Sequence, residues 1–157
     1  MSSAWIVQLA TAFTGSIGFA LLFNVPAAHL MPAGFGGFLG WAAYLLLGLW
    51  YQGDVLRFFA ASIAFTLYAE SLARIKKTPS TVFLVPAAIP LVPGASLYRS
   101  MRFTVDGAWM DFMNQIVYTL FLASAIAGGI VCGMTLVHVL EKVMHLRKKQ
   151  AAPDKGH

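Results

Sequence analysis

Long apolar runs, separated by short polar intervals, are the feature that most limits what this 157-residue sequence can fold into. A helix needs about 20 apolar residues to cross the hydrocarbon core of a bilayer. Charged residues make up 11% of the chain, against roughly 25% in soluble domains, which is too few to coat a water-soluble globule. The runs are residues 5–23, 34–51, 55–73, 81–98 and 112–140. We therefore predict an all-α fold, a polytopic membrane helix bundle over residues 1–149, followed by a short cytoplasmic polar tail at 150–157.

The second run begins with four glycines, at positions 34, 36, 37 and 40. Glycine is unfavourable inside a helix because it loses more backbone freedom on folding than any other residue. The run therefore either crosses the membrane, which gives five spans, or is partly re-entrant, which gives four. We expect His29 and Pro32 to lie in the loop that precedes it.

The fourth run carries Pro86, Pro90 and Pro93, followed by Gly94. Each proline inside a helix removes a backbone hydrogen bond and clashes with the preceding turn. In lipid the freed carbonyl groups need protein or water as partners, and transporters build substrate sites from such broken helices. We predict that this segment is broken and forms part of a central cavity. The alternative is a proline-kinked helix that binds no ligand.

Basic residues gather in two places that two predicted spans separate, namely the interval after the third run and the C-terminal end. The groups are Arg74, Lys76 and Lys77, and Lys142, Arg147, Lys148, Lys149 and Lys155. Lysine and arginine in short loops favour the cytoplasmic side. We therefore expect a cytoplasmic C-terminus, with the N-terminus outside if there are five spans and inside if there are four.

Polar groups beside the break are candidates for a substrate path. Backbone amides at 94–96 would begin a half-helix, and helix N-termini attract carboxylates. Gln115 lies one turn inside the fifth run, behind Asp111 and Asn114, which suit a helix cap. The predicted path residues are Asn24, Pro86, Pro90, Pro93, Gly94, Ser96, Tyr98 and Gln115.

Glu70, near the end of the third run, is a candidate for coupling transport to protons or cations, because intramembrane carboxylates are usually functional. The alternative is a structural pair with Arg74, four residues later, in which both side chains reach the interface. Both interpretations stay open at this stage.

Small residues recur at helical spacing in the first and fifth runs, which favours close packing between helices in lipid. We assign this packing role to Gly15, Ser16, Ala125, Gly129 and Gly133. A chain this short with two such faces is expected to associate with another subunit, either a companion chain or a second copy.

Signatures of enzymes, cofactor sites and metal sites are missing from the sequence. There is no glycine-rich phosphate loop, no His-Glu-x-x-His and no nucleophile elbow. The single cysteine, Cys132, excludes an internal disulfide framework and a cysteine-based metal cluster. We predict no enzymatic activity, no cofactor, no metal and no nucleic-acid partner; the expected partners are the lipid bilayer and a small-molecule substrate.

Two stretches carry a family resemblance: GFALLFNVP at 18–26 and VPAAIPLVPGASLY at 85–98. They resemble the threonine/serine exporter family, specifically its C-terminal half, which also occurs as a separate small membrane subunit. The resemblance implies proton-driven export of small amino acids such as threonine and serine across the bacterial inner membrane. It also implies a companion membrane subunit similar to the family's N-terminal half.

Two other functions stay open beside this one. Some two-subunit members of the family are associated with dicarboxylate export, so small dicarboxylates such as succinate are an alternative substrate. The chain could also be a structural or assembly subunit that transports nothing itself.

Overall fold

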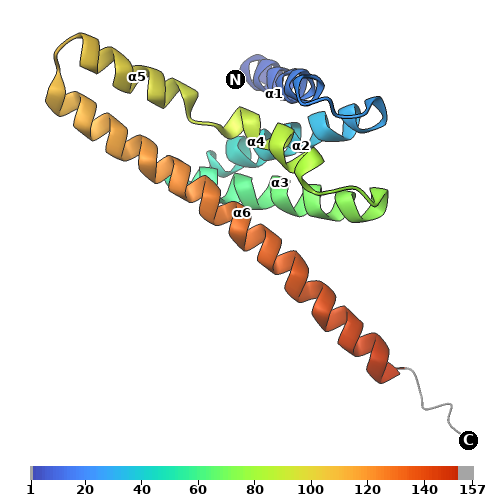
Figure 1. Cartoon of the computed structure of the whole chain (residues 1–157). Helices are drawn as coiled ribbons and strands as arrows, with labels where there is room; N and C mark the ends of the chain where they lie inside the picture. Colours follow the sequence, from blue (N-terminus) through green and yellow to red (C-terminus); the bar gives the residue numbers. More distant parts are fainter. Residues whose placement is uncertain (1, 152–157) are drawn as a thin grey trace, which may run out of the picture.

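The structure is a computed structural model that describes residues 2–151, with side chains described over 4–144; most of the predicted polar tail, from residue 152, lies outside this range. The described chain is helical apart from short connections (Figure 1). Its elements are α1 (Ser2–Leu22), α2 (Ala27–Leu47), α3 (Asp54–Lys76), α4 (Thr81–Ala88), the 3-10 helix η1 (Ile89–Leu91), α5 (Gly94–Val105) and α6 (Trp109–Ala151). The predicted all-α polytopic membrane fold is confirmed, because four helices are long and apolar enough to span a membrane, or five if the bent pair formed by α4–η1 and α5 is one span.

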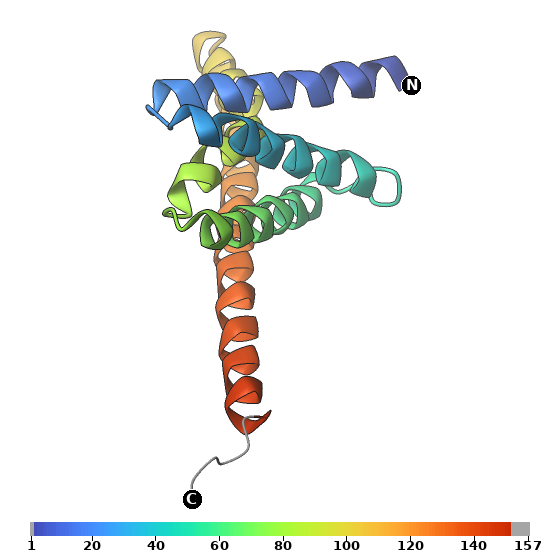
Figure 2. The same ribbon diagram turned by 90° about the vertical axis from the view of Figure 1, so that its right-hand side faces the viewer.

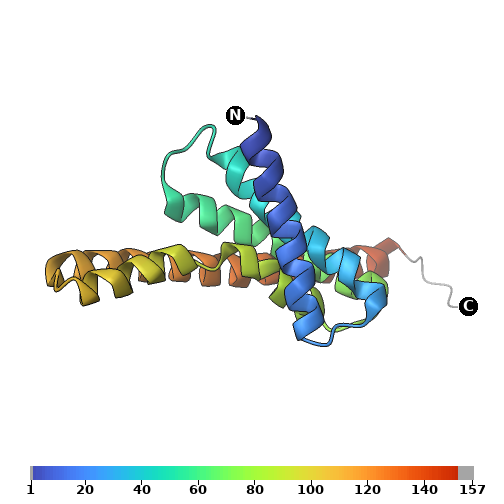
Figure 3. The same cartoon turned by 90° about the horizontal axis from the view of Figure 1, so that it is seen from above.

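The helices form two parts. In the first part, α1, α2 and α3 follow one another back and forth, and α4 with η1 packs on all three (Figure 2). In the second part, α5 and α6 lie side by side as a hairpin, which Figure 3 shows from above. Helix α6 crosses the first part along α3 and extends beyond it (Figure 1). We call the first part the body and the second the hairpin.

Helix α2 begins at Ala27, so the prediction that His29 and Pro32 lie in a loop is wrong. The helix runs unbroken for 21 residues and is long enough to span a membrane. Its four glycines are buried because other helices approach them closely. A Cβ on Gly36 would lie 2.8 Å from Ala87 of α4, and one on Gly40 would lie 3.1 Å from Leu91 of η1. Gly34 and Gly37 are approached most closely by α1. Close contacts with α1, α4 and η1 thus offset the roughly 1 kcal/mol that each glycine costs a helix.

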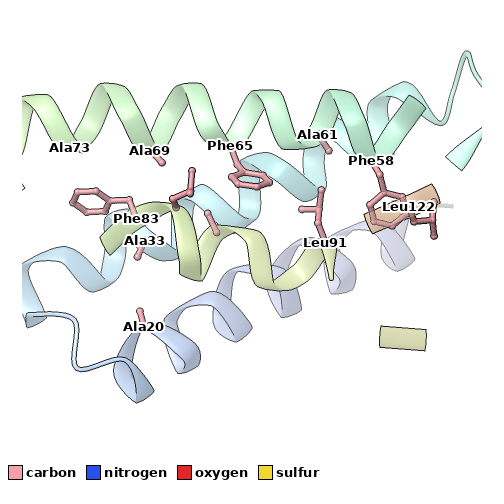
Figure 4. Close-up of a cluster of buried hydrophobic side chains, with 12 residues drawn as sticks. Ala20, Ala33, Phe58, Ala61, Phe65, Ala69, Ala73, Phe83, Leu91 and Leu122 are labelled. Atoms are coloured by element: carbon pink, nitrogen blue, oxygen red, sulfur yellow. The ribbon is translucent and has the colours of Figure 1, made fainter. Parts of the chain in front are cut away.

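The core of the body encloses the proline-containing segment. Phe65 of α3, Phe83 of α4 and Leu91 of η1 are fully buried among alanines of α1, α2 and α3 (Figure 4). Pro86 is also fully buried. Protein therefore covers the irregular backbone of this segment, as predicted, since α1, α2 and α3 all contact the segment.

Helix α6 has 43 residues and is longer than a bilayer requires. At 1.5 Å per residue it spans about 65 Å, roughly twice the 30 Å hydrocarbon core. It begins at Trp109, three residues before the predicted run, and continues into the basic C-terminal end. The helix therefore projects out of the membrane.

Candidate substrate path around the helix break

The break lies at Val92 and Pro93, where α4–η1 and α5 meet at a bend of 49°. Pro93 has no N–H and so cannot continue the helical hydrogen bonding. The Gly94 N–H donates to the Val92 carbonyl at 2.7 Å, which closes a tight turn. Helix α5 then begins at Gly94. The break thus joins the body to the hairpin.

The amides at the start of α5 are less available than we predicted. The Ser96 and Leu97 N–H groups both donate to the Pro93 carbonyl at 3.1 Å, and the Gly94 N–H is also engaged. Within the described chain, the Ala95 N–H alone of residues 94–96 has no backbone acceptor. A cradle of several free amides for a carboxylate is therefore absent from this end of α5.

Ser96 and Gln115, two of the predicted path residues, meet across the hairpin. The Gln115 side-chain amide donates to Ser96 Oγ at 2.6 Å, and the Thr119 hydroxyl lies 2.9 Å from the same oxygen. Ser96 and Thr119 are buried. We call these three side chains the polar clamp. Because they satisfy one another, they bind α5 to α6.

The other predicted path residues are dispersed. Asn24 is exposed at the turn after α1 and has a left-handed φ of 54°. The Val25 N–H donates to the Ala20 carbonyl and the Asn24 N–H to the Leu21 carbonyl, the pattern of a helix C-terminal cap. Asn24 therefore ends α1. Tyr98 is 70% exposed on α5.

Pro90 lines a hollow of about 210 Å³ that α1, α2 and η1 form together. The other lining residues are Gln8, Thr11, Ala12, Gly15, Trp41 and Ile89. The Trp41 indole N–H donates to Gln8 Oε1 at 3.3 Å and ties α1 to α2. Our sequence reasoning missed this hollow. The spacing of Gln8, Thr11 and Gly15 was the available signal, because positions three and four apart share one face of a helix.

Glu70 is 7% exposed and lies beside Arg74, as the spacing predicted, with 3.8 Å between Oε2 and Nη2. The guanidinium also pairs with Glu141 of α6. Arg74 therefore connects the end of α3 to the C-terminal half of α6. The basic residues of the sequence predict that this end of α3 lies on the cytoplasmic side. Glu70 is buried, so it does not reach solvent in the way that the structural alternative required.

A second ionic cluster, at the start of α3, was not predicted. Asp54 pairs with Arg57 at 3.1 Å and accepts hydrogen bonds from the hydroxyls of Tyr44 at 3.0 Å and Tyr118 at 2.6 Å. The Arg57 guanidinium lies 3.9 Å from the centre of the Tyr44 ring. This cluster joins α2, α3 and α6. Among the described residues, no group of three or more His, Cys, Asp or Glu could hold a metal ion.

The small residues of α6 lie against α3. A Cβ on Gly129 would meet Ser62, and one on Gly133 would lie 2.9 Å from Thr66. In α1, Ser16 is buried against Gly37 of α2. Gly15 differs, since nothing lies within 4 Å of the position its Cβ would occupy. Gly15 lines the hollow, and no other helix of the described chain approaches the position of its Cβ.

Comparison with known families settles what kind of protein this is. The family described as "Threonine/Serine exporter, ThrE" matches residues 8–137, which is most of the chain. The chain belongs to the threonine/serine exporter family. It is therefore a multi-pass membrane protein of an exporter family, whose members transport rather than catalyse. The match includes α2 to α5 and so covers both the hollow and the break. No solved structure matches the chain.

Proposed function

We propose that this chain is one subunit of a secondary-active exporter of small amino acids of the threonine and serine type, located in the bacterial inner membrane with its C-terminus in the cytoplasm. Membership of the threonine/serine exporter family supports the substrate class. The predominance of basic residues after α3 and at the end of α6 supports the orientation. The observation that carries the proposal is the break at Pro93, because it gives the chain a site at which it can bend.

Transport in this proposal is a movement of the hairpin relative to the body. The polar clamp keeps α5 on α6, so these two helices move together when the backbone bends at Val92 and Pro93. Secondary transporters change access by moving one helical unit against another around a central site. The buried segment α4–η1 stays with the body, because α1, α2 and α3 surround it.

One hydrogen bond and one ion pair oppose this movement. Tyr118 bonds to Asp54 and Glu141 pairs with Arg74, so each contact joins α6 to α3. We propose that Glu70 carries the coupled proton. Protonation of Glu70 would remove a negative charge from beside Arg74 and change how strongly that guanidinium holds Glu141. A proton gradient would then act on the contact that keeps the two parts together.

A companion membrane subunit similar to the N-terminal half of the family completes the proposed transporter. The α5–α6 hairpin projects from the body and carries large apolar side chains that are exposed in this chain. These include Leu97, Met101, Val105, Met110, Met113, Val117, Leu120 and Phe121, all at least 44% exposed. Arg99 and Arg102 are exposed on the same short helix. Lipid is a poor environment for these two charges, so part of this face is expected to contact a protein subunit or the aqueous boundary.

The test replaces Pro93 and Gly94 together by alanine in the host cells, with the companion subunit present. Alanine at both positions favours a continuous helix and removes the bend. We expect the variant to insert in the membrane but to lose efflux, so that threonine and serine accumulate inside the cells. Pro26→Ala, at an exposed proline in the turn before α2, is the control and should retain efflux.

Three arms separate the alternatives. Intracellular threonine, serine and succinate are measured in cells with the native chain, with the double variant and without the chain. Accumulation of succinate alone would show a dicarboxylate exporter. Unchanged levels of all three in cells without the chain would favour a non-transporting subunit, and unchanged efflux by the double variant would refute the hinge.

A further inference from the structure

The residues that line the hollow beside Pro90 suit a binding site, here called the seat, for a small ligand without net charge. It combines a carboxamide, a hydroxyl and an indole with the small residues Ala12 and Gly15. None of its seven lining residues is charged. A buried ligand with net charge would therefore lack a counter-charge here. A zwitterion, whose two charges compensate each other, suits this lining.

Gln8 is the lining residue best placed to hold a carboxylate. Its Oε1 accepts the Trp41 indole N–H at 3.3 Å, which fixes the side chain. Within the described chain its Nε2 has no hydrogen-bond acceptor, so two N–H donors remain for a ligand. The Thr11 hydroxyl is held by its own helix, with 2.9 Å between Oγ1 and the carbonyls of Val7 and Gln8. Its lone pairs still can accept a bond from a ligand.

Gly15 leaves the space in which a ligand side chain would lie. Gly15 and Gly18 both have nothing within 4 Å of a built Cβ, but Gly15 lines the hollow and Gly18 does not. A larger residue at position 15 would therefore narrow the hollow without clashing with another helix. The two glycines form a matched pair on one helix.

The opposite wall of the hollow belongs to η1, which precedes the break. Ile89 and Pro90 line the hollow, and the bend follows at Val92 and Pro93. Beside this wall, Ser16 Oγ is fully buried and has no hydrogen-bond partner in the described chain. A Cβ on Gly37 would contact Ser16 Oγ and lie 3.2 Å from Pro90, so the hydroxyl lies close to that ring. The hollow therefore lies in the body, directly before the break.

We propose that this hollow is the substrate seat of the exporter, that Gln8 binds the substrate carboxylate, and that Gly15 limits the size of the substrate side chain. This inference rests on the proposed function. Gln8 and Thr11 are exposed on the outside of this chain, where lipid would be an unfavourable neighbour. The companion subunit therefore covers the seat, and the site is complete only in the assembled transporter.

The test measures uptake of radiolabelled threonine and serine into inverted membrane vesicles that contain the full transporter. The size variant is Gly15→Val, because valine is stiff at χ1 and cannot turn out of the hollow. We expect it to lower threonine transport by roughly tenfold or more, as the loss of space for a methyl group does in other sites. Serine transport should fall less. Gly18→Val should transport both as the native chain does.

Gln8→Leu separates carboxylate binding from size. It should raise the KM for threonine and serine by the same factor, because both substrates carry the same carboxylate. Immunoblots of the vesicles show whether each variant is present at the native level. If Gly15→Val were poorly inserted, Gly15→Ala would be tested in its place. We expect Gly15→Ala to reduce transport less, and again to reduce threonine transport more than serine transport.

Failure of this inference differs from failure of the proposed function. If native vesicles transport neither amino acid, both fail. If they transport threonine and Gly15→Val or Gln8→Leu does so equally well, the seat lies elsewhere and the exporter proposal stands. An equal loss in Gly15→Val and Gly18→Val would also overturn the assignment, since only Gly15 lines the hollow.

Discussion

Two neighbouring glycines on α6 should respond in opposite directions to the same substitution. At Gly129 a Cβ would contact Ser62 Oγ and lie 2.5 Å from the Phe59 carbonyl oxygen of α3. Ser62 Oγ is itself bonded to that carbonyl at 2.7 Å. A backbone oxygen within a helix cannot move aside alone, so Gly129→Ala must push α6 away from α3.

The magnitude follows from two opposing contributions. Overpacking of this kind costs about 1–3 kcal/mol, while alanine gains about 1 kcal/mol over glycine in a helix. Because the blocking atom is a backbone oxygen, the cost should lie in the upper part of that range, about 2–3 kcal/mol, and Gly129→Ala should lower the free energy of unfolding by about 1–2 kcal/mol. At Gly128 the nearest atom to a Cβ is Phe59 Cε2 at 3.6 Å, an ordinary contact. Gly128→Ala should therefore be neutral or raise stability by up to about 1 kcal/mol.

The assay is thermal unfolding of the purified chain in a mild detergent, followed by size-exclusion fluorescence. One kcal/mol corresponds to roughly 2–4 °C for a chain of 150–250 residues, so the two variants should melt several degrees apart on opposite sides of the native protein. Equal melting temperatures would refute the reasoning, because the new methyl group would clash with α3 at position 129 but make only an ordinary contact with α3 at position 128.

Two further predictions concern the polar contacts of α6. Tyr118→Phe should cost about 1–2 kcal/mol, through loss of its bond to the Asp54 carboxylate. Asp54→Ala should cost more in the same melting assay, because it also leaves the largely buried Arg57 unpaired; an equal loss would contradict the pairing. Gln115→Leu should weaken the polar clamp and raise amide hydrogen exchange in α5. Exchange at the native level would show that the Gln115–Ser96 bond is not needed to hold α5 on α6.

Two polar contacts lie at opposite ends of the interface between α3 and α6. Asp54 and Tyr118 meet near the start of α3, and Arg74 and Glu141 meet near its end. The glycine contacts lie between them. The closest approach of the two helices therefore lies in the middle of their contact, with a polar contact at each end.

The sequence alone determined the features that depend on neighbouring residues. Apolar runs of membrane length predicted the spanning helices, and the three prolines followed by Gly94 predicted a broken segment, because a missing N–H acts within one turn of its own position. The structure places the break at the last of these prolines, while Pro86 lies inside α4. The Glu70–Arg74 pair was likewise predictable, since four residues separate its members. The family resemblance rested on such local stretches and was confirmed over residues 8–137.

Only the tertiary structure decided what the same residues do between helices. Glycines that seemed unfavourable for α2 are helical because α1, α4 and η1 approach them closely. The Gln8–Trp41 and Asp54–Tyr118 bonds join residues 33 and 64 positions apart, and no periodicity within one run can pair such residues. Asn24 was assigned to the substrate path because it is polar, yet its backbone ends α1. A side chain's identity limits the bonds it can form, and the packing of distant helices selects which of those bonds exist.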